Sequence, residues 1–193
     1  MSATGQDPET QVWLVRHGET EWSRDARHTS TTDLPLLPEG EDAARRLRAR
    51  LAAESFDVVL TSPRLRARRT AELAGFGDAT VDVDLAEWDY GAYEGLHTYQ
   101  IQAEVPDWTI WTHGARGGES PGEIAARLDR VIDRVRAGGG RVLCFGHGHA
   151  LRVLAARWIG QPVALGRQLM LGTSALSVLG YDRDVPVIIR WNQ

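Results

Sequence analysis

The chain has 193 residues, of which 42% are hydrophobic and 25% are charged, and its formal net charge at pH 7 is −4. This length suits one full-sized domain with its own core, and the composition is ordinary for a globular protein. The negative charge argues against a nucleic-acid-binding protein, no apolar run is long enough to span a membrane, and the single cysteine, Cys144, excludes an internal disulfide.

The first residues of the chain, 1–10, are polar and lack the charged-then-apolar layout of a secretory signal. We expect them to form a flexible tail, followed by a single domain over residues 11–193. Because the chain has one cysteine and no recognisable signal, the cytoplasm is the expected compartment.

Apolar runs and helical patterns alternate along the rest of the chain. The predicted strands are 12–15, 58–60, 142–145, 176–179 and 187–189, and the predicted helices are 38–53, 64–74, 121–136 and 150–159. The third helix has a start signal, with Ser120 before Pro121 and Glu123 three positions after the serine. This alternation predicts an α/β protein of three layers (α/β/α), with a mostly parallel central sheet and an active site at the C-terminal edge of the strands.

Residues 88–119 differ from the rest of the chain because they are rich in Trp, Tyr, Gly and His and show little periodicity. Segments of this length inside a domain are usually functional or locally structured. We predict that this segment passes over the strand ends and forms a wall or lid of the active site. Trp88, Trp108 and Trp111 are expected to pack it against the domain.

Charged and imidazole side chains follow three of the predicted strands. Arg16 and His17 follow the first, Arg66 lies in the arginine-rich segment after the second, and His147 follows the strand 142–145, while Glu87 enters the aromatic segment. The carboxyl ends of parallel strands meet at one edge of a sheet, so these groups are expected to lie together. Guanidinium groups neutralise phosphate oxygens, a neutral imidazole can attack phosphorus, and a carboxylic acid can protonate a leaving group. The pattern predicts phosphate-ester chemistry.

The pair His147-Gly148-His149 has a second interpretation, since imidazole is the commonest metal ligand in proteins. Alternate residues at a turn often diverge, however, and no set of Asp or Cys ligands accompanies the two histidines. We therefore expect no metal at this site.

Seven short motifs follow one another in the chain, and together they carry a resemblance to a known family. They are 16–20 with Trp22 (RHGET), 32–36 (TDLPL), 62–67 (SPRLRA), 87–91 (EWDYG), 93–95 (YEG), 118–120 (GES) and 147–152 (HGHALR). In this order they resemble the histidine phosphatase superfamily, the phosphoglycerate-mutase-like group. Within it the chain is most similar to acid phosphatases and to sugar phosphatases of the sedoheptulose-bisphosphatase type.

The resemblance implies a role for each group at the predicted strand ends. His17 would be the residue that becomes phosphorylated, and Arg16, Arg66 and His147 would complete the phosphate pocket. Glu87 would be the proton donor.

Several neighbouring residues are expected to contact the substrate: Ser23, Thr29, Ser30, Gly148 and His149. Ser23 stands where many relatives carry Asn, and Ser30 stands where a glycine is usual in the family.

Two further loop residues leave alternatives open. Glu94 competes with Glu87 for the role of the acid, but it could equally cap a loop or hold an arginine. His28 is the best placed of the remaining loop histidines to lie near a substrate.

The predicted function is that of a metal-independent phosphatase of the histidine acid phosphatase type. It would hydrolyse phosphomonoesters of small metabolites, with sugar phosphates favoured, through a phosphohistidine at His17, and with a mildly acidic pH preference. The resemblance implies no cofactor, and we expect a small phosphorylated metabolite as partner, no nucleic acid, no membrane, and a monomer or homodimer.

Two other functions stay open. A phosphoglycerate mutase is the first alternative, although residues 95–119 contain one arginine and no lysine to hold a substrate carboxylate. A non-catalytic module that binds phosphorylated ligands is the second, although such a protein would be expected to lack His17 or Glu87.

Overall fold

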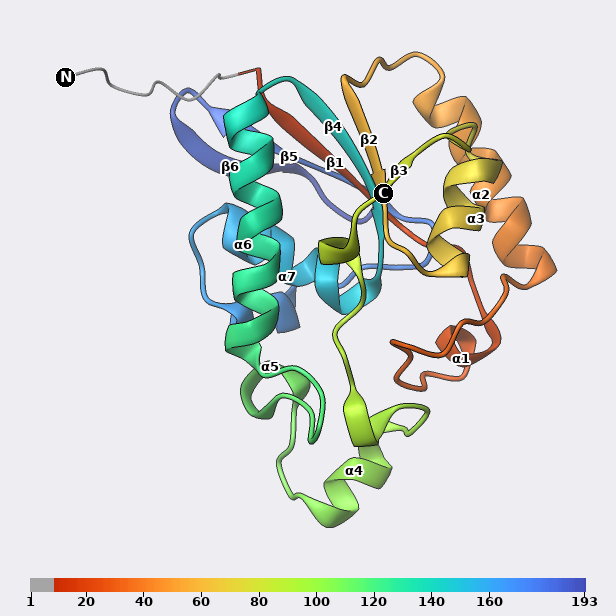
Figure 1. The fold of residues 1–193 in the computed structure, drawn as a ribbon, viewed down its shortest axis with the longest axis vertical. Coiled ribbons are helices and arrows are strands. Elements are labelled where there is room, and N and C mark those ends of the chain that lie inside the picture. The colour runs from red at the N-terminus through yellow and green to blue at the C-terminus, as the bar shows by residue number, and fades with distance from the viewer. Residues whose placement is uncertain (1–8) are drawn as a thin grey trace.

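A six-stranded sheet forms the centre of the protein, in the computed structural model that describes residues 9–193 (Figure 1). Its strand order is β3-β2-β4-β1-β5-β6. Strands β1 to β4 run parallel, whereas β5 is antiparallel to β1 and β6 is antiparallel to β5. The strands are β1 (Gln11–Arg16), β2 (Val58–Thr61), β3 (Thr80–Val81), β4 (Arg141–Gly146), β5 (Leu176–Asp182) and β6 (Val185–Arg190).

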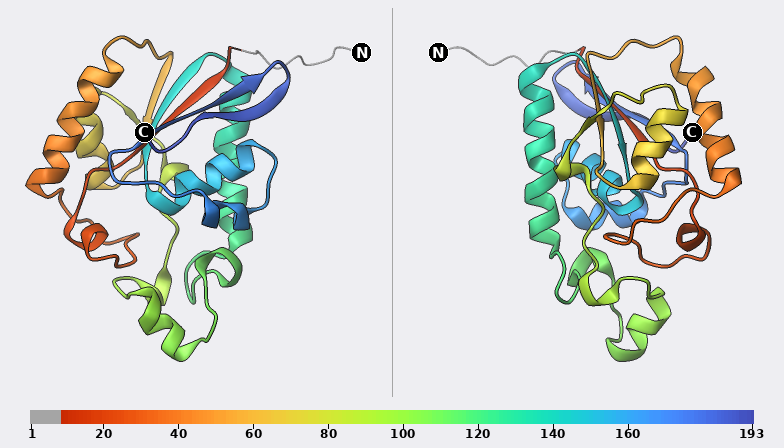
Figure 2. Two further views of the ribbon diagram at one scale, coloured as in Figure 1. Left: turned by 180° about the vertical axis from the view of Figure 1, so that it is seen from behind. Right: turned by 45° about the vertical axis from the view of Figure 1, so that its right-hand side comes forward.

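Helices cover both faces of this sheet and confirm the predicted three-layer α/β/α fold. Helices α2 and α3 lie on one face, and α6 and α7 lie on the other (Figures 1 and 2). Short 3-10 helices lie at 83–85, 91–93 and 163–168. The α-helices are α1 (Glu21–Arg24), α2 (Pro38–Leu51), α3 (Leu65–Leu73), α4 (Thr98–Glu104), α5 (Ile110–His113), α6 (Pro121–Gly138) and α7 (Gly148–Trp158).

The two faces of the sheet have separate cores because successive strand residues point to opposite faces. In β1, Val12 and Leu14 pack with the residues of α6 and α7. Trp13 and Val15 pack with residues of α2 and α3, and all four side chains are buried. This continuous apolar run is what a central strand covered on both faces requires.

The start of α6 is the one predicted from its sequence signal. The Ser120 hydroxyl accepts the Glu123 backbone N–H, and the Glu123 carboxylate accepts the Ser120 backbone N–H at 2.8 Å. This reciprocal capping satisfies two backbone donors that have no partner within the helix. The helix continues to Gly138, two residues beyond the predicted end.

Four short α-helices and strands of the described residues were not predicted: α1, which has four residues, β3, α4 and α5. Strand β3 has two exposed residues at the edge of the sheet, which is too short for a periodic signal. Helices α4 and α5 lie within the aromatic segment 88–119, where they have seven and four residues. Trp88, Trp108 and Trp111 are buried and pack this segment down, as expected.

The chain leading into β1 differs in one respect from the expected tail. Residues 1–8 lie outside the described residues, so most of the predicted tail over 1–10 does too. Thr10 is 1% exposed. It therefore belongs to the folded part of the chain.

Gly18, directly after β1, lies against the start of α2. A Cβ at Gly18 would be 2.6 Å from the Gly40 backbone oxygen, and a Cβ at Gly40 would be 2.6 Å from the Glu19 backbone nitrogen. Contacts this short exclude a side chain at either position. The backbone following β1 and the first turn of α2 therefore pack directly on each other.

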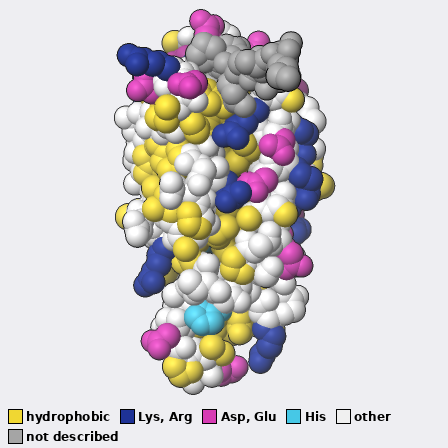
Figure 3. All heavy atoms as spheres, turned by 90° about the vertical axis from the view of Figure 1, so that its left-hand side faces the viewer, with side chains coloured by type: hydrophobic (Ala, Val, Ile, Leu, Met, Phe, Trp, Pro, Cys, Tyr) yellow, Lys and Arg dark blue, Asp and Glu magenta, His cyan; other side chains and the backbone are white. Residues whose placement is uncertain are grey.

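Figure 3 shows the side of the molecule on which α6 and the β5–β6 hairpin lie, where hydrophobic side chains gather in the upper half. The exposed hydrophobic residues of β6 are Val185 and Ile189.

Among the described residues, no helix combines the length and apolar character needed to cross a membrane.

Candidate active site

The register of the parallel strands brings the predicted site residues together. Arg16 lies opposite Gly146 in the β1–β4 pair, so His17 and His147, the next residue of each strand, follow at neighbouring positions. The two imidazole rings have centroids 5.2 Å apart and are inclined by 61°. Strand β2 ends beside β4, where the Ser62 N–H donates to the Phe145 carbonyl. The expected edge of the sheet is therefore the site.

The hydrogen bond of the His17 ring defines its tautomer. Nδ1 lies 2.7 Å from the carbonyl oxygen of Gly18, and a carbonyl oxygen can only accept, so Nδ1 carries the proton. Nε2 is then left with its lone pair. Burial, followed by the charges of Arg66 and Arg16, holds the pKa of His17 well below its ordinary value. The ring is therefore neutral and able to act as a nucleophile.

The second imidazole, His147, is fully buried and held by Ser62. Its Nε2 lies 2.7 Å from the Ser62 hydroxyl oxygen, which also accepts the Arg64 backbone N–H at 3.3 Å. The proton of Ser62 is thus available to Nε2, which leaves the ring proton of a neutral His147 on Nδ1. Burial and the charge of Arg66 keep the pKa of His147 well below the ordinary value.

Two guanidinium groups lie beside these rings. Arg16 donates from NH1 to the Leu171 carbonyl at 2.6 Å, and Arg66 donates to the carbonyls of the 29–32 loop. Arg66 is fully buried, whereas the neighbouring Arg69 pairs on the surface with acidic residues. Burial lowers the pKa of both Arg16 and Arg66, and the Glu87 charge opposes this.

Three N–H groups of the site have no partner. Within residues 9–193, Arg16 Nε, Arg66 Nε and the Nδ1 of His147 are buried and make no hydrogen bond. Buried donors are almost always satisfied in folded proteins, so such groups call for a ligand or water. Because all three can donate, the site is suited to an anion with several oxygens.

Glu87 lies at the start of α7 and accepts three backbone N–H groups. Its Oε1 accepts those of Trp88 and Ala150, both at 2.8 Å, and its Oε2 accepts that of His149 at 3.1 Å. Burial raises the pKa of Glu87, against the opposing effect of these hydrogen bonds and of Arg66. Oε2, with a single hydrogen bond, is the oxygen with room for a proton.

Glu94, the other candidate for the acid, caps a loop. Its carboxylate accepts the backbone N–H groups of Ser30 and Thr32 at 2.9 Å and the Ser30 hydroxyl at 2.5 Å. The same hydroxyl oxygen accepts the Tyr90 backbone N–H at 3.2 Å. Ser30 is buried and is not among the described residues that line the cavity, and its hydroxyl helps to hold the loop.

We expect Glu94→Gln to lower the melting temperature at neutral pH. Burial alone would raise the pKa of Glu94, but its hydrogen bonds to Ser30 and Thr32 outweigh burial and lower it. A carboxyl with a lowered pKa in the folded state adds stability above its ordinary value of 4.5, and that stability is lost as the pH falls through the folded-state pKa. The difference in melting temperature between wild type and variant should therefore shrink in acid.

Thermal unfolding at a series of pH values measures this effect, with Glu104→Gln as the control. Glu104 is 67% exposed, and its ion pair with Arg116 spans 3.9 Å, so its removal should leave the melting curves unchanged. A Glu94→Gln difference that is the same at all pH values would contradict the assignment.

A cavity of about 300 Å³ opens beside His17. Most of the predicted site residues line it, and Arg66, His147 and Ser30 are not among its lining residues. The predicted residues that line it are Arg16, His17, Ser23, Thr29, Glu87, Gly148 and His149. The residues that were not predicted as part of the site are Ala26, Arg27, Tyr90, Thr98, Arg152 and Leu171, together with His28, which was expected near a substrate.

Tyr90 is the most informative of the additional residues. Its hydroxyl lies 2.5 Å from the Nδ1 of His149, and its ring lies 4.7 Å from that of His28. Burial raises the pKa of Tyr90 well above its ordinary value, so the phenol stays neutral and is able to donate to His149. Both Tyr90 and Arg152 lie inside motifs that the sequence displays, so their place in a motif was the available signal.

The His147-x-His149 pair does not hold its rings together in one ligand set. His147 contacts Ser62, whereas His149 contacts Tyr90. In the part of the chain that the structure describes, no three His, Cys, Asp or Glu side chains form a group that could hold a metal ion.

The fold and the site together define a class of α/β protein with a buried imidazole pair and two guanidinium groups at the carboxyl end of a parallel sheet. A sequence model of the histidine phosphatase superfamily (branch 1) matches residues 12–193. The chain belongs to this superfamily.

Individual relatives include phosphatases. The chain is 39% identical to an acid phosphatase of Mycobacterium tuberculosis, over 91% of this chain and 88% of the relative. It is 38% identical to the sedoheptulose 1,7-bisphosphatase of Saccharomyces cerevisiae, over 91% of this chain and 76% of the relative. A Cronobacter sakazakii protein named "Probable phosphoglycerate mutase GpmB" is 31% identical over 94% of this chain and 89% of the relative.

A solved structure shows the same architecture. It is the product of an open reading frame of Mycobacterium tuberculosis, with a TM-score of 0.90 and 36% sequence identity, covering 94% of this chain and 96% of that chain. The mixed, mostly parallel sheet between helical layers is therefore the fold of this family.

Proposed function

We propose that the protein is a metal-independent phosphatase that hydrolyses phosphomonoesters of small metabolites through a phosphohistidine at His17. The observation that carries the proposal is the state of the His17 ring, whose Nδ1–H bond to Gly18 leaves Nε2 free. Around it lie buried N–H groups of Arg16, Arg66 and His147 that have no partner among the described residues. A phosphoryl group offers oxygens to those donors and phosphorus to the nucleophile.

In the first half of the reaction, the lone pair of His17 Nε2 forms a bond to phosphorus. The bond between phosphorus and the ester oxygen breaks, and its electron pair leaves with that oxygen. Glu87 donates its proton to the oxygen, so the product is a neutral alcohol. Arg16, Arg66 and His147 stabilise the charge on the remaining phosphoryl oxygens.

In the second half, the Glu87 carboxylate accepts a proton from water as the water oxygen bonds to phosphorus. The phosphorus–nitrogen bond breaks and its electron pair returns to Nε2 of His17. Inorganic phosphate leaves, and Glu87 is again a carboxylic acid. The neutral Nδ1–H of His17 keeps its bond to Gly18 throughout, so the ring needs no change of tautomer.

The cavity supports a small polar substrate. Its volume is about 300 Å³, and its lining includes Arg27, Arg152, Tyr90 and His28. Guanidinium groups and hydrogen-bonding rings suit a hydroxylated or anionic leaving group. Two phosphatase relatives, one named for a sugar bisphosphate, favour a sugar phosphate as substrate.

A panel of phosphorylated metabolites tests the proposal, from triose to heptulose phosphates with nucleotides as comparison. We expect release of inorganic phosphate, fastest for a sugar phosphate and undiminished by a metal chelator. Isomerisation of phosphoglycerate without release of phosphate would establish the mutase alternative instead. Loss of activity with chelator and recovery with zinc would contradict the metal-independent mechanism.

A further inference from the structure

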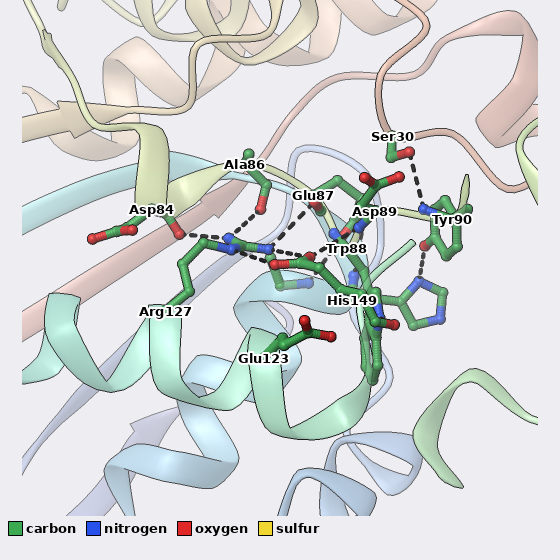
Figure 4. Close-up of polar contacts among 12 residues, drawn as sticks. Ser30, Asp84, Ala86, Glu87, Trp88, Asp89, Tyr90, Glu123, Arg127 and His149 are labelled. Atoms are coloured by element: carbon green, nitrogen blue, oxygen red, sulfur yellow. Dashed lines mark hydrogen bonds and ion pairs between the residues drawn. The ribbon is translucent and has the colours of Figure 1, made fainter. Parts of the chain in front are cut away.

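The backbone that carries Glu87 has little regular structure. It lies between the 3-10 turns at 83–85 and 91–93, so its carbonyl groups lack the partners that a helix or sheet ladder would provide. Such groups need donors from elsewhere when they are buried. A side chain of α6, Arg127, provides them (Figure 4).

The guanidinium of Arg127 contacts three carbonyl groups of this segment. NH1 donates to the carbonyls of Asp84 at 2.6 Å and Ala86 at 2.9 Å, and NH2 lies 3.4 Å from the carbonyl of Glu87 itself. The planar fork of the guanidinium fixes the directions of these bonds relative to one another. Arg127 therefore holds the backbone on the approach to Glu87.

Glu119 binds the Nε–NH2 edge of the Arg127 guanidinium and also binds the residues that follow Glu87. Its two carboxylate oxygens accept Arg127 Nε at 2.8 Å and NH2 at 2.7 Å. Its Oε2 also accepts the Asp89 backbone N–H at 3.0 Å, and its carbonyl accepts the indole N–H of Trp88 at 2.9 Å. The Arg127–Glu119 pair thus binds the chain on both sides of Glu87.

This pair is well shielded from water. The side chains of Arg127 and Glu119 are 12% and 21% exposed, whereas Arg130, one turn further along α6, is 57% exposed. A shielded bidentate pair has a defined geometry and is weakened little by salt. The carboxyl group of Glu87 meanwhile accepts the backbone N–H groups of His149 and Ala150 at the start of α7.

We propose that Arg127, held by Glu119, is a positioning residue that places the Glu87 carboxyl for proton transfer to the leaving group. This proposal rests on the proposed function, in which Glu87 is the acid. Arg127 does not line the cavity; it acts through the backbone of residues 84–89. Its loss would leave the carbonyls of this segment without a donor and Glu119 without its cation.

The test compares two substrates that differ in their need for an acid. The alkyl ester glycerol 2-phosphate has a poor leaving group and needs the proton, whereas p-nitrophenyl phosphate has a good one. The measured quantity is kcat/KM, which reports steps up to release of the alcohol. For Arg127→Ala we expect a loss of about 10²-fold with glycerol 2-phosphate and of less than about threefold with p-nitrophenyl phosphate.

Arg130→Ala is the matched control. It removes the same charge from the same helix and breaks an ion pair with the side chain of Asp84, without touching the carbonyls of residues 86 and 87. We expect it to change neither value of kcat/KM by more than about twofold. Arg127→Lys should restore part of the activity toward glycerol 2-phosphate, because a lysine ammonium can replace only some of the hydrogen bonds that the guanidinium donates.

Equal losses on both substrates in a folded Arg127→Ala protein, or no loss on either, would overturn the proposal. If circular dichroism shows that Arg127→Ala does not fold, Glu119→Gln decides by the same criterion. Failure of the proposed function would look different, since the wild-type protein itself would then release no phosphate from either substrate.

Discussion

Replacement of His17 by asparagine is expected to lower kcat for phosphate release by on the order of 10⁴-fold or more. Asparagine is polar and fits the space, but it has no nitrogen with an available lone pair to bond to phosphorus. The phosphate pocket of Arg16, Arg66 and His147 stays in place. Binding of inorganic phosphate should therefore persist while turnover is lost, which separates loss of the nucleophile from loss of the site.

The control for this experiment is His113→Asn. His113 lies at the end of α5, exposed and outside the cavity, and its replacement should leave kcat unchanged. Rapid quenching in alkaline denaturant, in which a phosphorus–nitrogen bond survives, followed by mass spectrometry should detect a phosphoryl group on the wild-type enzyme and none on His17→Asn. A His17→Asn protein with full activity, or a phosphoryl group on another residue, would refute the assigned nucleophile.

Glu87→Gln is expected to have the second largest effect. Glutamine keeps the shape of the carboxyl but cannot donate an acidic proton, so kcat/KM for glycerol 2-phosphate should fall by about 10²- to 10⁴-fold. The loss should be much smaller for p-nitrophenyl phosphate, whose leaving group needs no acid. Glu104→Gln, at an exposed site outside the cavity, serves as the control for the change of charge.

The pH profile gives an independent measure of the same residue. Because Glu87 donates only when protonated, kcat/KM of the wild-type protein should fall as the pH rises through its pKa, which burial raises. On the acidic side, the lowered pKa of His17 keeps the nucleophile neutral. We therefore expect mildly acidic pH to be favoured, and Glu87→Gln to lack the decline at higher pH. A wild-type profile that rises steadily into alkali would contradict this assignment.

The sequence was sufficient to predict the layers and the place of the site. Continuous apolar runs such as 12–15 mark strands that are covered on both faces, and Arg16 and His17 at the end of one run mark the ligand-binding edge. Selecting Arg66 from its arginine-rich neighbourhood needed the family motif, because spacing alone does not distinguish it from Arg69. The structure shows the physical difference: Arg66 is buried beneath the loop that it holds, and Arg69 forms surface ion pairs.

Other parts of the site depend on contacts between distant segments, which no local pattern encodes. Leu171 offers its carbonyl to Arg16 across the fold, and Tyr90 meets His149 from a different segment. Ser30 is a further example: its place in a motif predicts a ligand contact, and the structure adds that its hydroxyl donates to the distant Glu94 carboxylate. The two-residue strand β3 is likewise defined by its pairing with β2, and its own residues give no periodic signal.

The contact between Gly18 and Gly40 couples the loop after β1 to the first turn of α2, although the two segments are separated in the sequence. Since neither glycine has room for a Cβ, the first turn of α2 cannot slide or tilt without moving the peptide between Gly18 and Glu19. The carbonyl of that peptide is the one that orients the imidazole. We therefore expect insertions, fusions or stabilising substitutions near the start of α2 to alter turnover, even though this helix is separated in sequence from every residue of the proposed phosphate pocket.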